Sequence, residues 1–201
     1  MDETIDIRSV RPDEWRRLRD VRLRSLADTP DAFGETLAQA HARPDTSWRR
    51  WIHHGWGRGP QLTLVADDGS SALRGIVVGV QEDEAPQVAY VYAMWVDPSV
   101  RRTGVGTRLI DGVASWARAR GASCLRLGVA TDNQTAIAMY RRRGLRPAPS
   151  GGYTLHEGSR VACMTMELVI DDNTRAGHPP GRMSSSGTAS GERRRSQRRA
   201  R

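Results

Sequence analysis

The sequence predicts a mixed α/β (α+β) domain with a central, mostly antiparallel sheet flanked by helices. Three observations indicate this fold: short stretches with apolar residues at alternate positions, two later stretches with apolar residues at helical spacing, and an alternation of strand and helix in the second half. The expected order is strand, two helices, three strands, helix, strand, helix and two strands. Consecutive strands favour antiparallel pairing, whereas strand–helix–strand favours a parallel pair.

The first part of the chain predicts one strand and two helices. Ile5, Ile7 and Val10 have the spacing of a half-buried strand. Residues 12–14, Pro-Asp-Glu, are typical of a first helical turn, and Thr29-Pro30 interrupts the helix. Residues 45–47 offer caps for a second, short helix. The apolar positions of the two helices are expected to be Trp15, Leu18, Val21 or Arg22, and Leu26 in the first, and Trp48, Trp51 and Ile52 in the second.

The middle of the chain predicts three successive strands over residues 62–66, 73–80 and 88–96, joined by a turn at 67–70 and a polar connection at 81–87. The third strand is apolar almost throughout, so we expect it at the centre of the sheet, ending at Pro98. A helix over 107–120, a strand over 124–129, a helix over 133–143 and a closing hairpin of 153–155 with 161–168 follow. Gly121 and Gly144 are placed as helix C-caps.

Charge and composition divide the 201 residues into a domain and a tail. Residues 1–170 carry 23 arginines against 20 acidic residues, whereas residues 171–201 carry 8 against 3. Most of the net charge of +8 therefore lies in the last segment. After Met183 no apolar residue larger than alanine remains, so that segment cannot bury enough surface to offset its chain entropy. We expect one domain over residues 1–170 and a disordered tail over residues 171–201.

Composition also argues against several classes of protein. No apolar run approaches the ~20 residues of a membrane-spanning helix, and the polar, acidic residues 1–4 are unlike a secretory signal. Cys124 and Cys163 lie far apart in apolar stretches, which fits neither a zinc knuckle nor a disulfide framework and suits a reducing cytoplasm. We expect a cytoplasmic protein that needs no metal.

A glycine loop between a strand and a helix is the clearest sign of chemistry. Arg101-Arg102-Thr103-Gly104-Val105-Gly106 follows the strand 88–96 and precedes the helix 107–120. Glycines let backbone N–H groups approach an anion and a helix N-terminus adds positive potential, so the segment is typical of a phosphate site. A plain tight turn would also use these glycines. The absence of Gly-Lys-Ser/Thr and of a third glycine excludes a Walker loop and a dinucleotide fingerprint.

The loop and a later segment together resemble the GNAT superfamily of N-acetyltransferases. Arg101-x-x-Gly104-x-Gly106 is similar to the Q/R-x-x-G-x-G/A loop of that family. Asn133, Ala136, Tyr140 and Gly144-Leu145 resemble its N-x-x-A-x-x-x-Y-x-x-x-G-F segment. The resemblance covers roughly residues 5–168 and is strongest over 94–145. Residues 22–33 also look like a subgroup of these enzymes, most of which have no assigned substrate.

The resemblance implies acetyl-CoA as co-substrate, seated where the sheet splays between strands 88–96 and 124–129. Backbone N–H groups of Met94–Val96 could supply the donors for the developing oxyanion if the first of these strands splays from the second. Tyr140 would serve as the acid for the leaving thiolate, because a phenol of pKa ~10 is protonated at neutral pH; a core tyrosine is the alternative. Asn133 could bond the cofactor, cap its helix, or both. The expected cofactor-binding residues are Met94, Trp95, Val96, Arg101, Arg102, Thr103, Gly104, Val105, Gly106 and Asn133.

The general base and the acceptor pocket stay open at the level of sequence. Gly128 stands where ribosomal-protein N-terminal acetyltransferases of this family carry a glutamate, which argues against that substrate class. Arg102 and Leu145 also depart from the usual glycine and phenylalanine, as minor changes. Residues that could reach the pocket, each equally suited to an ordinary surface or core position, are Glu35, Glu82, Asp83, Glu84, His53 and His54 as bases and Trp48, Trp51, Trp56, Tyr90 and Tyr92 as walls.

We expect an enzyme that passes acetyl directly to a primary amine, on a small molecule rather than a protein, in a ternary complex. Neither cysteine has the neighbours that mark a thiolate nucleophile. The alternatives are a non-catalytic acetyl-CoA-binding or nucleic-acid-associated module, and a protein N-terminal or lysine acetyltransferase. The tail has clustered arginines but no aromatic residue for base stacking, so we expect weak attraction to nucleic acid at most. We expect no membrane partner and leave a homodimer open.

Removing residues 171–201 should leave the chemistry intact. A chain ending at Ile170 should fold and turn over substrate as the full chain does, because every motif above precedes the tail. It should lose only salt-sensitive attraction to polyanions. Activity of the two proteins at low and high salt is the measurement; a large loss on truncation that persists at high salt would place the domain boundary elsewhere.

Overall fold

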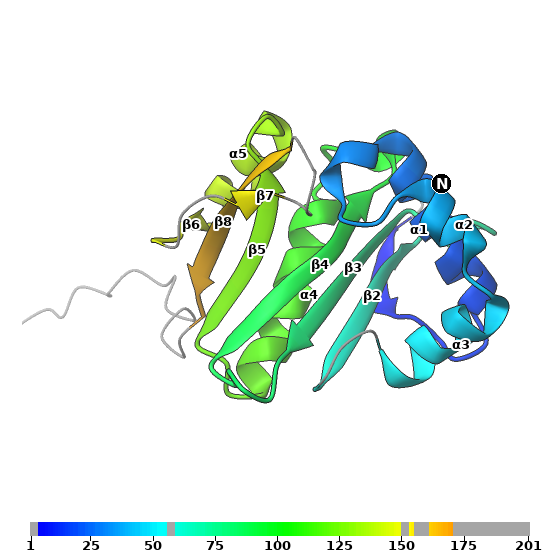
Figure 1. The fold of residues 1–201 in the computed structure, drawn as a ribbon, viewed down its shortest axis with the longest axis horizontal. Coiled ribbons are helices and arrows are strands. Elements are labelled where there is room, and N and C mark those ends of the chain that lie inside the picture. Colours follow the sequence, from blue (N-terminus) through cyan, green and yellow to red (C-terminus); the bar gives the residue numbers. More distant parts are fainter. Residues whose placement is uncertain (1–3, 56–58, 150–152, 155–160, 171–201) are drawn as a thin grey trace, which may run out of the picture.

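The computed structural model describes residues 4–55, 59–149, 153–154 and 161–170, so the predicted tail lies outside the described residues. The sheet has the strand order β1-β2-β3-β4-β5-β8-β6, with β7 paired to β8 (Figure 1). The strands are β1 (Asp6–Ser9), β2 (Gln61–Asp67), β3 (Gly75–Gln81), β4 (Val88–Val96), β5 (Cys124–Ala130), β6 (Arg146–Pro147), β7 (Tyr153–Thr154) and β8 (Ala162–Val169). The helices are α1 (Trp15–Asp28), α2 (Leu37–Ala42), α3 (Asp45–His54), α4 (Val105–Ala119) and α5 (Gln134–Arg142), with 3-10 turns η1 (Pro30–Ala32) and η2 (Pro98–Val100).

The sheet is mixed, and its one parallel pair lies at the centre. β1 to β4 pair antiparallel in succession, and β8 pairs antiparallel with β5, β6 and β7. β4 and β5 pair parallel, because α4 carries the chain back across the sheet between them. The apolar strand predicted at residues 88–96 is therefore confirmed as a central strand. Within the described ranges, no helix has the length and apolar character needed to span a bilayer.

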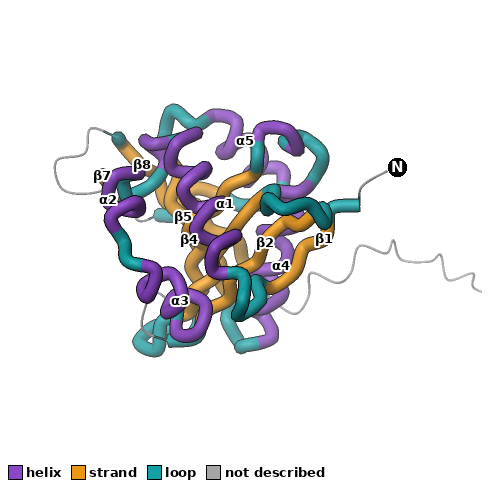
Figure 2. Tube along the Cα trace, turned by 90° about the vertical axis from the view of Figure 1, so that its right-hand side faces the viewer, coloured by secondary structure: helices purple, strands orange, loops and turns teal. Residues whose placement is uncertain are grey.

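Helices cover both faces of the sheet, and each face has its own core. On β2, Leu64 packs in the core beneath α4, whereas Val65 packs in the core with α1 and α3. On β3, Val77 faces the α4 side and Ile76 the α1 side. This division follows from the pleat, which turns successive side chains to opposite faces. Figure 2 shows α1 and α3 on one side of the strands, and α4 on the other.

The helix after the glycine loop begins earlier than predicted. α4 starts at Val105 rather than Thr107, so Gly106 lies inside its first turn. Gly104 is its N-cap, with φ +89°. Its apolar residues Leu109, Ile110, Val113, Ala114 and Ala117 are buried, and Gly121 follows its end with φ +81°. The first residue of α4 could not be predicted from the spacing of apolar side chains, because Gly106 in its first turn has no side chain.

The structure corrects four expectations, three of them in the first part of the chain. α1 begins at Trp15, because Pro12 lies in a turn closed by the Glu14 N–H donating to the Arg11 carbonyl at 3.0 Å. Residues 45–47 form the first turn of α3 and do not cap it; Pro44 is its N-cap. α2 was not expected, although Thr36 and Gln39 form a capping box at its start. The short β6 was also not expected.

An ionic network fixes the start of α1 to the edge of the sheet. Arg8 on β1 donates through both terminal nitrogens to the Glu14 carboxylate, each at 2.7 Å. Arg17 donates to Glu14 at 2.6 Å and to Asp67 on β2 at 2.9 Å. The Glu14 side chain is only 4% exposed, so its charge depends on these partners. Arg8, above all, lowers the pKa of Glu14 to about 2, against the opposing effect of burial.

Glu14→Gln should lower the free energy of unfolding by on the order of 3 kcal/mol, because it removes the buried carboxylate that the half-buried Arg8 and Arg17 share. In the wild type, stability from ionised Glu14 is complete above pH ~4.5 and is lost as pH falls toward 2, since its folded pKa is depressed. The variant should lose less stability across that window. Urea unfolding from pH 2.5 to 7 is the measurement, with the exposed neighbour Asp13→Asn as the control. Equal stability of Glu14→Gln and wild type at pH 7 would contradict this role.

Candidate functional site

β4 and β5 separate partway along their length. Their parallel pairing runs from Val88–Cys124 to Val91–Leu127, and no further pair follows within these two fully described strands. Beyond that point β4 stays paired with β3 up to Val96, and β5 stays paired with β8 up to Ala130. Each strand therefore has one backbone edge without a neighbouring strand. Figure 1 shows β4 and β5 diverging toward the end of the sheet at which α5 lies.

A bulge lies on β4 where the two strands part. Tyr92 pairs with Val78, and the next pair joins Trp95 to Ile76, so β4 has one extra residue. Ala93 has φ +51°, which is uncommon for a residue with a side chain. Such a bulge bends its strand and turns nearby backbone groups in a new direction. The bulge accounts for the divergence of β4 from β5, which the sequence predicted only through the family resemblance.

The backbone beyond the bulge alternates between the two neighbouring strands. The Asp97 N–H donates to the Arg74 carbonyl at 2.8 Å on the β3 side. Alternation along the strand then turns the Trp95 N–H toward β3 as well, and the N–H groups of Met94 and Val96 toward the gap. The Trp95 indole donates to Asp28 at 2.9 Å, while Met94 lines the pocket described below. The geometry thus favours Met94 and Val96 over Trp95 as donors to a molecule in the gap.

The glycine loop leads from β4 into α4 and leaves backbone N–H groups at its surface. Residues 101–104 are exposed, and Gly104 caps α4 without a side-chain hydrogen bond. The first four N–H groups of a helix have no partner within it. The Thr103 hydroxyl donates to the Val100 carbonyl at 2.7 Å within the loop. Arg101 is also engaged, donating to the Val96 carbonyl at 2.9 Å and pairing with Asp28.

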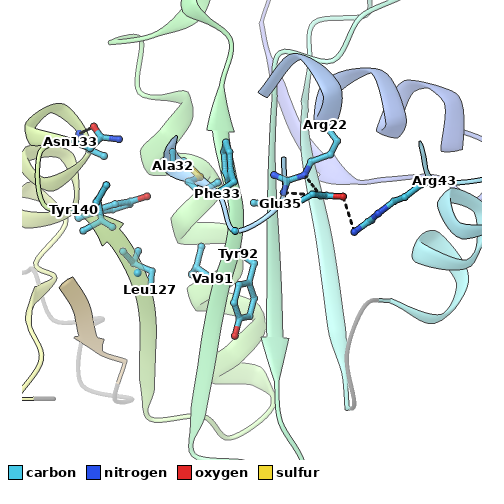
Figure 3. A pocket seen from close by; sticks show the side chains of 17 residues that line it. Arg22, Ala32, Phe33, Glu35, Arg43, Val91, Tyr92, Leu127, Asn133 and Tyr140 are labelled. Carbon is cyan, nitrogen blue, oxygen red and sulfur yellow. Dashed lines mark hydrogen bonds and ion pairs between the residues drawn. The ribbon is translucent and has the colours of Figure 1, made fainter. Parts of the chain in front are cut away.

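A cavity of about 420 Å³ occupies the gap, and the predicted Tyr140 lines it. Tyr140 on α5 is 6% exposed, and its hydroxyl points away from α5 into the cavity (Figure 3). Burial raises the pKa of Tyr140, so this phenol stays protonated at neutral pH. Asn133 also lines the cavity, and its side chain accepts from the Ala136 N–H at 3.1 Å as the N-cap of α5. The capping role proposed for Asn133 is therefore present; its contact with a cofactor stays a prediction.

The opposite side of the cavity carries an ionic cluster, and of its members only Glu35 was among the candidate pocket residues from the sequence. Glu35 pairs with Arg22 of α1 at 3.1 Å and with Arg43, which follows α2, at 2.8 Å. The Arg22 guanidinium lies over the ring of Phe33 at 4.6 Å. Figure 3 shows the three charged side chains across the cavity from Tyr140. We name Arg22, Glu35 and Arg43 the cationic cluster; Arg43 gave no sequence signal because its partner is eight residues away in an irregular segment.

The other candidate bases do not line this cavity. Glu35 lines it, but its carboxylate is held by two arginines. Glu82, Asp83 and Glu84 belong to the connection between β3 and β4. His53 lines a separate cavity beside β2, and the side chain of His54 lies outside the described residues.

Of the aromatic candidates, Tyr92 is the one that lines the cavity among those the structure describes. Trp48 and Trp51 are buried in the α1-side core and stack with ring centroids 5.7 Å apart. Tyr90 stacks on Tyr92 at 6.3 Å but does not line the cavity. Trp56 lies outside the described residues.

The two cysteines have the properties of unactivated thiols. Cys124 and Cys163 are unbridged, and burial raises the pKa of each. Neither lines the cavity, and a raised pKa opposes formation of a thiolate. In the part of the chain that the structure describes, no group of three His, Cys, Asp or Glu side chains is placed to hold a metal ion.

Comparison with known proteins agrees with the site geometry. Residues 22–145 match the family model described as acetyltransferase (GNAT) family. The chain is 30% identical over 128 residues to the ribosomal protein bS18-alanine N-acetyltransferase of Salmonella typhimurium, covering 64% of this chain and 81% of that protein. It is 34% identical over 89 residues to the L-2,4-diaminobutyric acid acetyltransferase of Nocardia farcinica, covering 42% of this chain and 46% of that protein. The chain thus spans less than half of that relative's length.

Solved structures show the same fold. A GNAT-family acetyltransferase from Streptococcus pneumoniae superposes with a TM-score of 0.68 at 20% identity, covering 83% of this chain and 99% of that one. A putative acetyltransferase from Salmonella typhimurium, solved with its cofactor acetyl-CoA, gives 0.65 at 14% identity, covering 88% and 98%. At these identities the likeness concerns the fold alone.

Proposed function

The chain belongs to the acetyltransferase (GNAT) family, and we propose from this premise that it transfers acetyl from acetyl-CoA to a primary amine of a small molecule. The observation that carries the proposal is the gap between β4 and β5, whose cavity is lined by Tyr140 and by Met94, and the Met94 side chain reaches Gly106 at the start of α4. A thioester cofactor needs an anion site at one end, an extended channel, and a reacting centre at the other. The glycine loop would supply the first, the gap the second, and Tyr140 with the β4 backbone the third.

The cofactor would be held largely by backbone groups. The N–H groups at the start of α4, around Gly104 and Gly106, would bind the pyrophosphate. The β4 edge beyond Val91 would pair with the amides of the pantetheine arm, as a third strand would. Arg101 would hold the loop in place rather than bind the phosphates with its side chain, because that side chain already contacts Asp28 and the end of β4. Exposed Arg102 would add charge beside the phosphates.

The reaction would be a direct transfer. The neutral amine nitrogen attacks the thioester carbonyl carbon, and the developing oxyanion accepts hydrogen bonds from N–H groups beyond the bulge at Ala93. The C–S bond breaks, and the leaving sulfur takes a hydrogen bond and then a proton from Tyr140. The amide nitrogen loses its extra proton to water, and water restores the phenol. We assign no side chain as general base.

A panel of amines tests the activity and separates it from a binding module. The full chain is incubated with acetyl-CoA and amino acids, polyamines, aminoglycosides or peptides with free N-termini, and release of free thiol is followed. Thiol release that depends on a small amine supports the proposal. Release with peptides alone would favour a protein acetyltransferase. The likeness to the bS18 enzyme supports that substrate class, whereas Gly128 in the pocket wall argues against it. Binding of acetyl-CoA without turnover of any amine would instead favour a non-catalytic acetyl-CoA-binding module.

Gly104→Val should abolish the rise in melting temperature that acetyl-CoA causes. A β-branched residue is strained at φ +89°, so the N-cap and its N–H groups should move. Gly121→Val is a matched control: it has φ +81° at the other end of α4, and an added Cβ meets nothing within 4 Å at either position. Both variants should lose similar stability, but only Gly104→Val should lose the response. A folded Gly104→Val protein with the full response would refute the phosphate site.

Tyr140→Phe should lower turnover by roughly 10²-fold, the range of general-acid catalysis, with little change in the affinity for acetyl-CoA. The phenyl ring still fills the same core position, so stability should change little. Steady-state kinetics and a thermal shift with acetyl-CoA are the measurements. Wild-type turnover in this variant would leave Tyr140 with a packing role.

A further inference from the structure

The cationic cluster faces the cavity from the side at which an acceptor must enter. The cofactor would occupy the gap between β4 and β5, with Tyr140 beside its sulfur. Arg22, Glu35 and Arg43 line the same cavity from α1 and from the segments around α2, across from Tyr140 (Figure 3). They therefore border the space left for the second substrate.

The cluster has an excess of positive charge in a sheltered position. The side chains of Arg22 and Glu35 are 5% and 14% exposed, and that of Arg43 is 36% exposed. Two guanidinium groups share one carboxylate, and none of the other described residues lining the cavity is charged at neutral pH. A charge in such a place is poorly screened by water and attracts an anion strongly.

The titration of Arg22 agrees with this excess. Burial lowers the pKa of Arg22, and the charge of Arg43 lowers it further, so the pairing with Glu35 does not offset both. An additional anion beside Arg43 would relieve that repulsion. A second cation would add to it, and Glu35 is not free to receive one because both arginines hold it.

We propose that the acceptor is an amine that also carries a carboxylate, and that Arg43, supported by Arg22, binds this carboxylate while the amine faces the thioester. The proposal rests on the proposed function and names its substrate class. Arginine suits this role because its planar donors match the geometry of a carboxylate. A cavity of about 420 Å³ that also admits the acetyl end of the cofactor favours a small amino acid over a longer chain.

Matched acceptors isolate the contribution of the carboxylate. The probes are 2,4-diaminobutyrate, its carboxamide, and 1,3-diaminopropane, which lacks the carboxyl group; lysine, lysinamide and cadaverine form a second set. For at least one set, kcat/KM for the amino acid should exceed that for both matched compounds by about tenfold or more, as expected when one partly buried charge contact is lost. The proposal would be overturned if, in both sets, the compounds without a carboxylate had a kcat/KM equal to or higher than that of the amino acid.

Variants of Arg43 locate the discrimination. Arg43→Gln should bring the ratio between amino acid and carboxamide close to one, mainly through the KM of the amino acid, and Arg43→Glu should reverse the preference toward the diamine. Arg50→Gln removes the same charge from an exposed position in α3 and should keep the wild-type ratio. Because Arg43 also lies 5.5 Å from the Trp48 ring, melting temperatures accompany the kinetics. An unchanged ratio in folded Arg43→Gln would contradict the assignment.

A binding measurement separates the proposal from the proposed function. The melting temperature of the protein saturated with CoA is followed as each probe is added. If no amine is acetylated but the amino acids alone raise this temperature, and Arg43→Gln removes the effect, the anion site stands and the activity does not. If all three compounds of a set are acetylated equally and shift the temperature equally, the activity stands and the anion site does not.

Discussion

The separation of β4 from β5 after the Val91–Leu127 pair is the constraint on which the rest of the site depends. Two strands in the middle of a sheet normally satisfy each other's backbone groups, and buried groups left without partners are costly. The fold accepts that cost over the second half of both strands. The bulge at Ala93 provides the bend, and α5 provides the wall on the far side. An extended ligand with its own amides is the natural partner for such an opening.

α1 connects the two ends of this opening. Arg22, on its inner face, belongs to the cationic cluster at the side where the acceptor would enter. Asp28, its last residue, accepts from the Trp95 indole and pairs with Arg101 of the glycine loop. The loop geometry and the pocket wall therefore depend on the placement of a single helix. The network of Arg8, Glu14, Arg17 and Asp67 sets that placement at the other end of α1.

The sequence was most informative where structure is local. The glycine loop, the helix after it, and the segment from Asn133 to Gly144 are each defined by neighbours in the chain, and these elements were predicted to within a few residues. The bulge at Ala93 has no local signal, because alanine fits a regular strand equally well. The position of Arg43 beside the cavity could not be predicted, since it depends on how α2 and α3 fold back onto α1.

The ionic network also bears on the order in which the chain folds. Arg8 and Arg17 lie 59 and 50 residues from Asp67, whereas Glu14 is their near neighbour. Until β2 has formed, Arg8 and Arg17 lack the Asp67 carboxylate, and Glu14 is the member of the network that lies close to them in the chain. Contacts over such separations form late because a long loop must close first. The seating of the start of α1 therefore depends on β2 being in place, so the position of the helix that borders the cavity is coupled to the far edge of the sheet.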